Sequence, residues 1–176
     1  MNPKLKNIFN IVGFYIGWWG CVLGAANEMS YLGPSVMLIF LIAHFYLFVS
    51  SNQEIYLVLI ICFLGTVIDT ALFFSGSFVY AGAYSNELLI APLWITSMWA
   101  GFAATVNHSM SWLKDKWGLM VICGVVFGPA AFYTGEKFEA IDFSLSLLSS
   151  AMIIGFVYGV AMPGIYYLNG YLGLDE

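Results

Sequence analysis

The spacing of apolar runs is the feature that most constrains this chain. Six runs follow one another with short polar segments between them, and most approach the ~20 apolar residues that one crossing of a ~30 Å hydrocarbon core needs. They cover residues 7–26, 31–49, 55–79, 88–112, 117–134 and 143–170. The pattern predicts an all-α fold: a polytopic transmembrane helical bundle of about six helices with short loops, forming a single integral membrane domain over residues 1–176.

Composition points to the same environment and excludes several classes of function. Hydrophobic residues make up 61% of the chain and charged residues 9%, whereas soluble domains have about 45–50% and about 25%. The net charge is −5, and no basic patch is present that would suit nucleic acid, so no nucleic-acid partner is expected. Nucleotide-binding loops, G-x-S-x-G turns and H-E-x-x-H helices are also absent from the sequence.

The lysines predict an orientation in the membrane. Lys4 and Lys6 precede the first run, and Lys114 and Lys116 lie between the fourth and fifth runs. With six crossings these four positions fall on one side, and Lys137 falls on the other. Because cytoplasmic loops carry the excess of basic residues, the N and C termini are both predicted to be cytoplasmic.

Small residues predict how the helices pack. In run 7–26 they recur at spacings of three or four, which places them along one face of a helix: Asn10, Gly13, Gly17, Gly20, Gly24 and Asn27. Run 143–170 repeats the pattern with Ala151, Gly155 and Gly159. Such faces let two helices approach closely in lipid. Packing within the chain is the preferred interpretation, and the alternative is an interface with a membrane-protein partner or a second copy in a homo-oligomer.

Three polar residues in the apolar runs are candidate catalytic groups: Asp69, His108 and His44. Asp69 lies about fourteen residues into run 55–79, close to the middle of the bilayer, where an acid costs about 2.5–3.5 kcal/mol and is therefore paired, protonated or functional. The functional interpretation is a general acid or base. The structural alternative is a capped acid bonded to Thr, Trp or backbone groups of a neighbouring helix.

The histidine His108 raises the same choice. A continuous helix over 88–112 would align it with a small, polar face: Trp94, Ser97, Gly101, Thr105, His108 and Trp112. Its ring is then expected to face protein and not lipid. Hydrogen bonds across helices are one explanation, and proton transfer near the interface is the other.

Candidate substrate-binding residues are Trp99, Asn107 and Trp18. Trp18 and Trp99 are expected at a depth similar to that of Asp69, where they would form walls of an apolar pocket, and Asn107 precedes His108. Filling of the bundle interior is the alternative for the tryptophans.

No metal or cofactor is expected. His44 and His108 are predicted at matching depth, roughly 6–9 Å below the inner surface, but Asp69 lies more than ~10 Å deeper. Two imidazoles alone make a weak metal site. The cysteines give no further ligand set because they stand singly in separate runs: Cys21, Cys62 and Cys123.

Several segments carry a resemblance to a known family. In chain order they are LGAANEMSYLGP, His44, GTVIDTALF, APLWITSMWAGFAATVNHSMSWL and VFGPAAFYTGEKFEA, with the best match over Pro92 to Ser109. They resemble the small bacterial inner-membrane family catalogued as "domain of unknown function 2878". The resemblance implies a multi-pass protein of the bacterial inner membrane with membrane lipids as partners. Relatives tend to be encoded near fatty-acyl-modifying and amine-oxidase-like proteins, which implies a link to membrane lipid metabolism.

Three hypotheses for function follow. The first is a small intramembrane enzyme, or enzyme subunit, that acts on a fatty-acyl lipid. The second is a non-catalytic membrane scaffold or anchor for a lipid-modifying partner. The third is a small transporter, which the sequence supports least because the Gly-Pro pairs at 33–34 and 128–129 occupy non-equivalent positions in the two halves.

Overall fold

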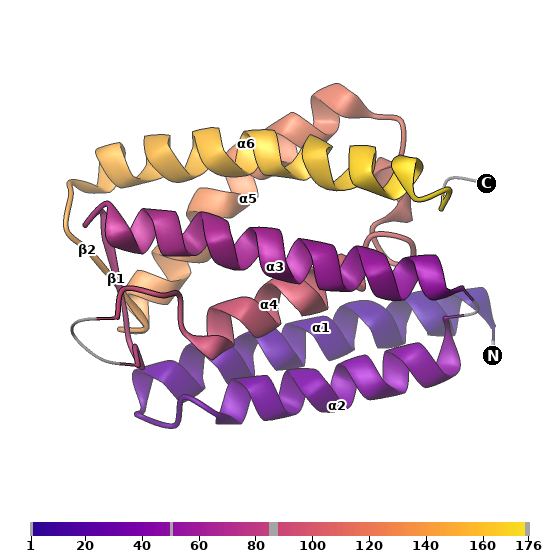
Figure 1. Ribbon diagram of the computed structural model, residues 1–176, viewed down its shortest axis with the longest axis horizontal. Coiled ribbons are helices and arrows are strands. Elements are labelled where there is room, and N and C mark those ends of the chain that lie inside the picture. Colours follow the sequence, from indigo (N-terminus) through magenta and orange to yellow (C-terminus); the bar gives the residue numbers. More distant parts are fainter. Residues whose placement is uncertain (1, 50, 85–87, 175–176) are drawn as a thin grey trace.

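The structure is a computed structural model that describes residues 2–49, 51–84 and 88–174. Within these residues the chain forms six α-helices, one short 3₁₀ helix and two short strands (Figure 1). In chain order they are α1 (Pro3–Ala26), α2 (Leu32–Leu47), α3 (Asn52–Phe74), β1 (Phe78–Tyr80), α4 (Leu93–Ala103), η1 (Ser111–Leu113), α5 (Trp117–Lys137), β2 (Ile141–Phe143) and α6 (Leu147–Tyr171). The all-α fold class predicted from the apolar runs is confirmed.

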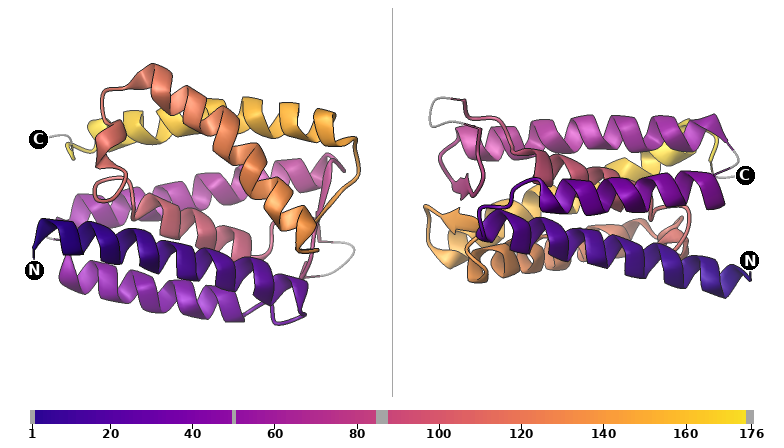
Figure 2. Two further views of the ribbon diagram at one scale, coloured as in Figure 1. Left: turned by 180° about the vertical axis from the view of Figure 1, so that it is seen from behind. Right: turned by 90° about the horizontal axis from the view of Figure 1, so that it is seen from below.

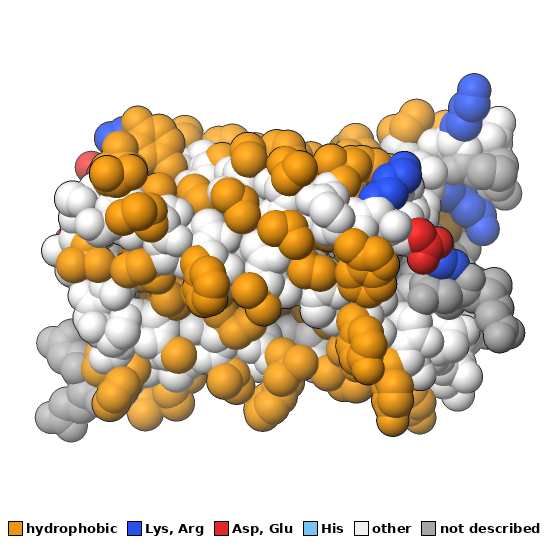
Figure 3. Space-filling view, turned by 90° about the horizontal axis from the view of Figure 1, so that it is seen from above, with side chains coloured by type: hydrophobic (Ala, Val, Ile, Leu, Met, Phe, Trp, Pro, Cys, Tyr) orange, Lys and Arg blue, Asp and Glu red, His pale blue; other side chains and the backbone are white. Residues whose placement is uncertain are grey.

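The helices are those of a membrane protein. Within the described residues, α1, α3, α5 and α6 are long and apolar enough to cross a membrane, while α2 has 16 residues and α4 has 11. Many large apolar side chains point outward, among them Phe156 at 76% exposure and Phe63 at 67%. Figure 3 shows apolar side chains along the middle of one face and charged side chains only towards its ends. Lipid is the solvent that such a surface requires.

The short helix α4 lies among the other helices, with Trp94, Ile95 and Trp99 buried. In Figure 1, α3 and α6 lie towards the viewer and α5 lies behind them, and the rear view in Figure 2 shows α5 and α1 in front. The first residues of α1 and the last residues of α6 lie at the same end of the bundle (Figure 1). The chain therefore runs along the long axis of the bundle an even number of times.

Glycines set the contact between α1 and α2. A Cβ on Gly17 would lie 2.7 Å from Met37 Cε, and a Cβ on Gly33 would lie 2.2 Å from the Cα atom of Cys21. The second contact is between backbones, so no side-chain movement can relieve it. The small face of α1 predicted from the sequence therefore lies against α2 within the same chain.

The second small face, on α6, lies against α5. Gly159 faces Val125, where an added Cβ would stand 2.8 Å from Val125 Cγ2, and Gly124 faces the carbonyl oxygen of Tyr158. Both helices continue through an internal proline, Pro129 in α5 and Pro163 in α6. The close approach of α5 and α6 covers the glycines of both.

Two of the predicted helices were too long because part of each run forms a strand. Run 55–79 is helical only to Phe74, and α6 begins at Leu147 instead of 143. The strands between pair antiparallel with Phe78 opposite Phe143, Val79 opposite Asp142 and Tyr80 opposite Ile141. Hydropathy does not separate an apolar strand from an apolar helix, and the pairing partner is distant in sequence.

The predicted helix over 88–112 was also wrong. Only Leu93–Ala103 is helical as α4, and residues 104–110 form turns before η1. The carbonyl oxygen of Ala104 accepts a hydrogen bond from Asn10 Nδ2 at 2.9 Å, and the hydroxyl of Thr105 donates to the Phe102 carbonyl at 2.6 Å. These bonds stabilise the end of the helix. The remaining runs, 7–26, 31–49 and 117–134, differ from α1, α2 and α5 by a few residues at their ends.

Candidate functional site

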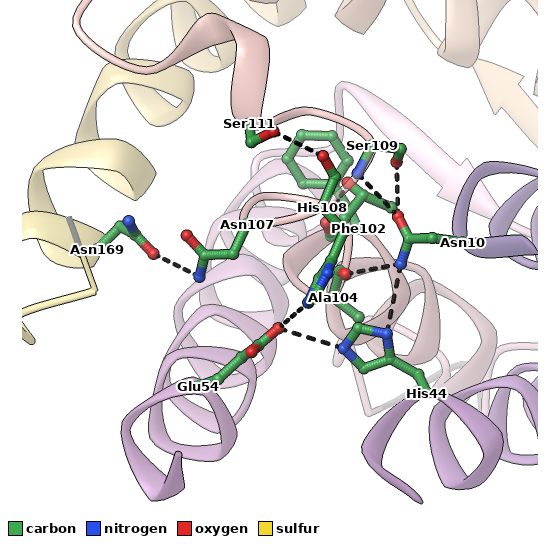
Figure 4. Close-up of polar contacts among 11 residues, drawn as sticks. Asn10, His44, Glu54, Phe102, Ala104, Asn107, His108, Ser109, Ser111 and Asn169 are labelled. Carbon is green, nitrogen blue, oxygen red and sulfur yellow. Dashed lines mark hydrogen bonds and ion pairs between the residues drawn. The ribbon is translucent and has the colours of Figure 1, made fainter. Parts of the chain in front are cut away.

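Three polar side chains, two from neighbouring helix ends and one from a distant segment, meet near the end of the bundle that carries the first residues of α1. His108 Nε2 lies 2.7 Å from Glu54 Oε1, and His44 Nε2 lies 3.3 Å from the same oxygen atom (Figure 4). The two imidazole rings are nearly perpendicular, at 86°, with their centroids 4.8 Å apart. We call these three residues the His–Glu–His cluster.

The α2–α3 connection positions two members of the cluster. His44 lies in the last turn of α2, and Glu54 lies in the first turn of α3. Ser51 is the N-cap of α3, where its hydroxyl accepts a hydrogen bond from the Gln53 backbone at 3.2 Å. Because the two helices run in opposite directions and are joined by a short connection, both side chains reach the same depth.

The third member, His108, comes from the turns that follow α4. Its backbone N–H donates to the Thr105 carbonyl at 3.1 Å, so it lies beyond the α-helix and not on a helical face with Trp94 and Gly101. The polar contacts of residues 104–109 with Asn10 hold this segment against α1. The ring nevertheless faces protein, as the sequence predicted, because the segment turns inward towards Glu54.

The surroundings of the cluster are aromatic and mostly dry. His44 is fully buried, and the ring centroids of Phe40, Phe45 and Phe48 lie 5.5–5.9 Å from its own. The side chain of Glu54 is 9% exposed and that of His108 is 16% exposed. Electrostatic interactions are stronger in such a medium than in water. The cluster therefore has a closed side at His44 and an accessible side at His108.

The arrangement suits acid–base chemistry. A carboxylate oxygen accepts from an imidazole Nε2–H, which orients the ring and leaves its other nitrogen as the basic atom. Among the described residues, His108 Nδ1 has no hydrogen-bond partner, and it belongs to the accessible ring of the pair. Either the neutral or the protonated form of His108 can donate from Nε2 to Glu54, so a proton can be held or released at Nδ1.

By distance alone, the cluster also suits a metal ion. One ligand atom from each of His44, Glu54 and His108 lies within 4.8 Å of the others. Asp69, the acid that the sequence offered to the two histidines, lies too far away, and Glu54 supplies the carboxylate in its place. The hydrogen bonds around His44 decide between these two possibilities.

Asp69 is not part of this cluster. It lies about 22 Å further along α3 at ~1.5 Å per residue, fully buried. Its two oxygens accept hydrogen bonds from Tyr80 Oη at 2.8 Å and from Trp99 Nε1 at 2.5 Å. The Trp99 ring stacks on Tyr158 of α6. Asp69 thus connects α3, β1 and α4, which is the geometry of the capped-acid alternative.

The donor Tyr80 keeps its proton. Burial raises the pKa of its phenol well above the usual value, and the neighbouring Asp69 carboxyl adds to the rise. Tyr80 therefore serves as a hydrogen-bond donor to Asp69 over the whole range of physiological pH.

The structure separates the three predicted substrate-binding residues. Trp99 bonds to Asp69 and packs against Gly65, where an added Cβ would lie 2.1 Å from the indole ring. Asn107 donates to Asn169 Oδ1 at 2.8 Å, which connects the turns after α4 with α6. Trp18 is half-buried and packs edge-on against Trp19, with ring centroids 5.0 Å apart. Asp69 has Trp99 as a partner but not Trp18.

Sequence reasoning missed Glu54. It stands three residues after Ser51, in the S-x-x-E spacing of a helix capping box, and lies in a polar segment between two apolar runs. Both features favour a local role at the surface. Asn10 was predicted to lie on the packed face of α1. Nothing in the sequence around it indicates its hydrogen bonds to residues 104 and 109.

One known protein family matches nearly the whole chain. The family described as "Protein of unknown function (DUF2878)" matches residues 7–164, a stretch that holds the complete His–Glu–His cluster and Asn10. The chain belongs to this family. The resemblance seen in the sequence is thereby confirmed. Among curated proteins and among solved structures, nothing matches the chain.

Proposed function

We propose that this protein carries out acid–base chemistry in the membrane. His108 takes up and releases a proton, and Glu54 orients the His108 ring. The observation that carries the proposal is the 2.7 Å contact of Glu54 Oε1 with His108 Nε2, on an accessible ring whose Nδ1 has no hydrogen-bond partner within the part of the chain that the structure describes. Carboxylate–imidazole pairs of this kind act as general bases. His44 is the buried donor that completes the hydrogen bonding of the same oxygen.

We further propose that the substrate class is a membrane lipid with fatty-acyl chains, so that the chain is a small intramembrane enzyme or a subunit of one. The cluster lies at the last turn of α2 and the first turn of α3, with aromatic rings around it, and the ends of membrane helices are where headgroups and acyl chains are expected to meet. The outer surface of the bundle is apolar, so a lipid reaches this depth from within the bilayer. The implied link of the family with fatty-acyl-modifying proteins supports the same class.

The bacterial inner membrane is the proposed location, with both termini in the cytoplasm. The support is the excess of lysines at one end of the bundle: Lys4 and Lys6 at the start of α1, and Lys114 and Lys116 before α5, against Lys137 at the end of α5. On this orientation the His–Glu–His cluster lies near the cytoplasmic face.

A scaffold for a lipid-modifying partner is the second candidate. It is favoured by one observation: the polar network links α1, α2, α3 and the turns after α4, which is also what a purely structural cluster would do. A transporter role has no comparable support.

Complementation of a deletion strain separates these functions. Fatty-acyl lipids are profiled in the deletion strain carrying the native gene, Glu54→Gln or His108→Gln. We expect the native gene to restore the profile and both variants to fail at normal abundance, because an amide does not exchange a proton near neutral pH. Asp142→Asn, the same type of change at an exposed strand residue, is the control and should restore it.

Two results would overturn the proposal. A lipid profile that is identical with and without the gene removes the lipid substrate. A profile restored by His108→Gln removes the acid–base role and favours the scaffold.

A further inference from the structure

The side chain amide of Asn10 is held in one orientation by the backbone around it. Its Oδ1 atom accepts from the Ser109 backbone N–H at 3.3 Å and from the Ser109 hydroxyl at 2.6 Å, while its Nδ2 atom donates to the Ala104 carbonyl at 2.9 Å. A backbone N–H can only donate and a carbonyl can only accept. Turning the amide over would place two donors together at Ser109 and two acceptors together at Ala104. The orientation of Asn10 is therefore fixed.

This orientation determines which nitrogen of His44 carries the proton. The amide –NH₂ has two hydrogens, and the one not used by Ala104 points to His44 Nδ1 at 3.3 Å (Figure 4). Nδ1 must accept, so the proton of the neutral ring is on Nε2, where it faces Glu54 Oε1. A doubly protonated ring would set an N–H of His44 against an N–H of Asn10 in a site with no access to water, since both residues are fully buried.

We propose that Asn10 is a positioning residue that holds His44 as the neutral Nε2–H tautomer. His44 is then a hydrogen-bond donor to Glu54 through Nε2, and His108 is the imidazole of the cluster that presents its other ring nitrogen on the accessible side. The inference rests on the proposed function in taking this cluster as the working centre, and it assigns the two histidines different roles within it.

The same tautomer keeps a metal out of the cluster. A histidine that binds a metal through Nε2 offers a lone pair there and donates its Nδ1–H to an oxygen atom. Asn10 presents –NH₂ where that oxygen would stand. The three ligand atoms are spaced for a metal, but the proton on His44 Nε2 occupies the position that the ion needs. Asn10→Asp replaces the –NH₂ by a second oxygen, which can accept from His44 Nδ1–H but gives up the hydrogen bond to the Ala104 carbonyl.

Nitrogen NMR tests the proposal directly because the chain has only two histidines. The full-length protein in detergent, labelled with ¹⁵N in its imidazoles, gives one ring pattern for each histidine in long-range proton–nitrogen spectra at neutral pH. His108→Gln leaves one pattern and so assigns His44. We expect His44 to show a protonated Nε2 and an unprotonated Nδ1. A protonated Nδ1 in the native protein, alone or together with Nε2, would overturn the inference.

Two variants, at the hydrogen-bonded residues Asn10 and Ser109, test the proposal further. Asn10→Asp should move the proton of His44 to Nδ1 and raise affinity for Co²⁺ about ten-fold or more, the usual size of an outer-shell effect. Ser109→Ala removes a hydroxyl donor but keeps the backbone N–H, so the native tautomer and weak metal affinity should remain. Tight stoichiometric Co²⁺ binding by the native protein would contradict the proposal. If Asn10→Asp does not fold, the native spectrum still decides it.

Failure of this inference is distinguishable from failure of the proposed function. A native Nε2–H tautomer of His44, combined with restoration of the lipid profile by His108→Gln, leaves the role of Asn10 standing and removes the acid–base function. If His44 in the native protein carries its proton on Nδ1 and His108→Gln fails to restore the lipid profile, the role of Asn10 is removed and the acid–base function stands.

Discussion

Glu54 Oε1 and His108 Nε2 lie 2.7 Å apart although 54 positions separate the two residues in the chain. The contact joins the first turn of α3 to the turns after α4, and the same Glu54 oxygen also accepts from His44 of α2. One carboxylate oxygen thus satisfies two imidazole N–H groups in a site that is largely closed to water. Removing it has consequences for stability as well as for function.

Glu54→Ala should lower the free energy of unfolding by about 2–6 kcal/mol, because it leaves two largely buried imidazole N–H groups without an acceptor, at about 1–3 kcal/mol each. Glu54→Gln should cost less, since its amide oxygen still accepts from one ring. Thermal unfolding in detergent measures both. Asp142→Ala, at an exposed position, should change the melting temperature little. Equal stability of Glu54→Ala and the native protein would show that the contact does not form.

Asp69→Asn should be tolerated. Its oxygen can accept from Trp99 Nε1, and its –NH₂ can donate to the Tyr80 oxygen after the hydroxyl turns. Asp69→Leu leaves both donors without an acceptor and should cost about 2–6 kcal/mol, about 1–3 kcal/mol for each. The interpretation of Asp69 as a general acid or base requires a different outcome: normally folded Asp69→Asn protein that fails to complement the deletion strain. Lipid profiles and melting temperatures of the two variants separate these explanations.

Gly33→Ala should destabilise the protein by about 1–3 kcal/mol, because the added Cβ meets the backbone of Cys21 at 2.2 Å and forces α1 and α2 apart. Gly118→Ala is the matched control, since a Cβ there meets no atom of the described residues within 4 Å. Its effect should stay within about 1 kcal/mol of zero, the range of helix propensity. Matching melting temperatures for the two variants would contradict the tight α1–α2 contact.

Reporter fusions test the orientation. A reporter active only in the cytoplasm should be active when fused at Asn2 or after Lys116, and inactive when fused after Glu139. The expectation follows from the positive-inside rule applied to the four lysines at one end of the bundle. Activity of the Glu139 fusion with inactivity at Asn2 would reverse the orientation and place the His–Glu–His cluster at the outer face.

Local sequence properties predicted much of this fold. The all-α class and the succession of six helices follow from the length and hydropathy of the runs, because lipid accepts a backbone only when its polar groups are bonded within the segment. The packed face of α1 follows from the spacing of its glycines, since residues three and four apart share one side of a helix. His44 and His108 were predicted at matching depth, and their rings do meet.

Tertiary contacts decided the remainder. The turns after α4 are bonded to Asn10, a residue of another helix, and hydropathy over 88–112 carries no sign of such a contact. The strands β1 and β2 depend on each other in the same way. Glu54 had the local appearance of a capping residue, and only the approach of α2 and the turns after α4 turned its carboxylate into the partner of two imidazoles.

What the sequence by itself determined is the class of the protein, the number and order of its helices, and which polar residues lie among apolar ones, because these depend on neighbours along the chain. What only the tertiary structure decided is which polar residues meet. Asp69 is hydrogen-bonded to Tyr80 and Trp99, while His108 is hydrogen-bonded to Glu54. The physical reason is that a buried donor or acceptor takes the partner that the packing of other segments brings within about 3 Å, and no spacing in the sequence encodes that distance.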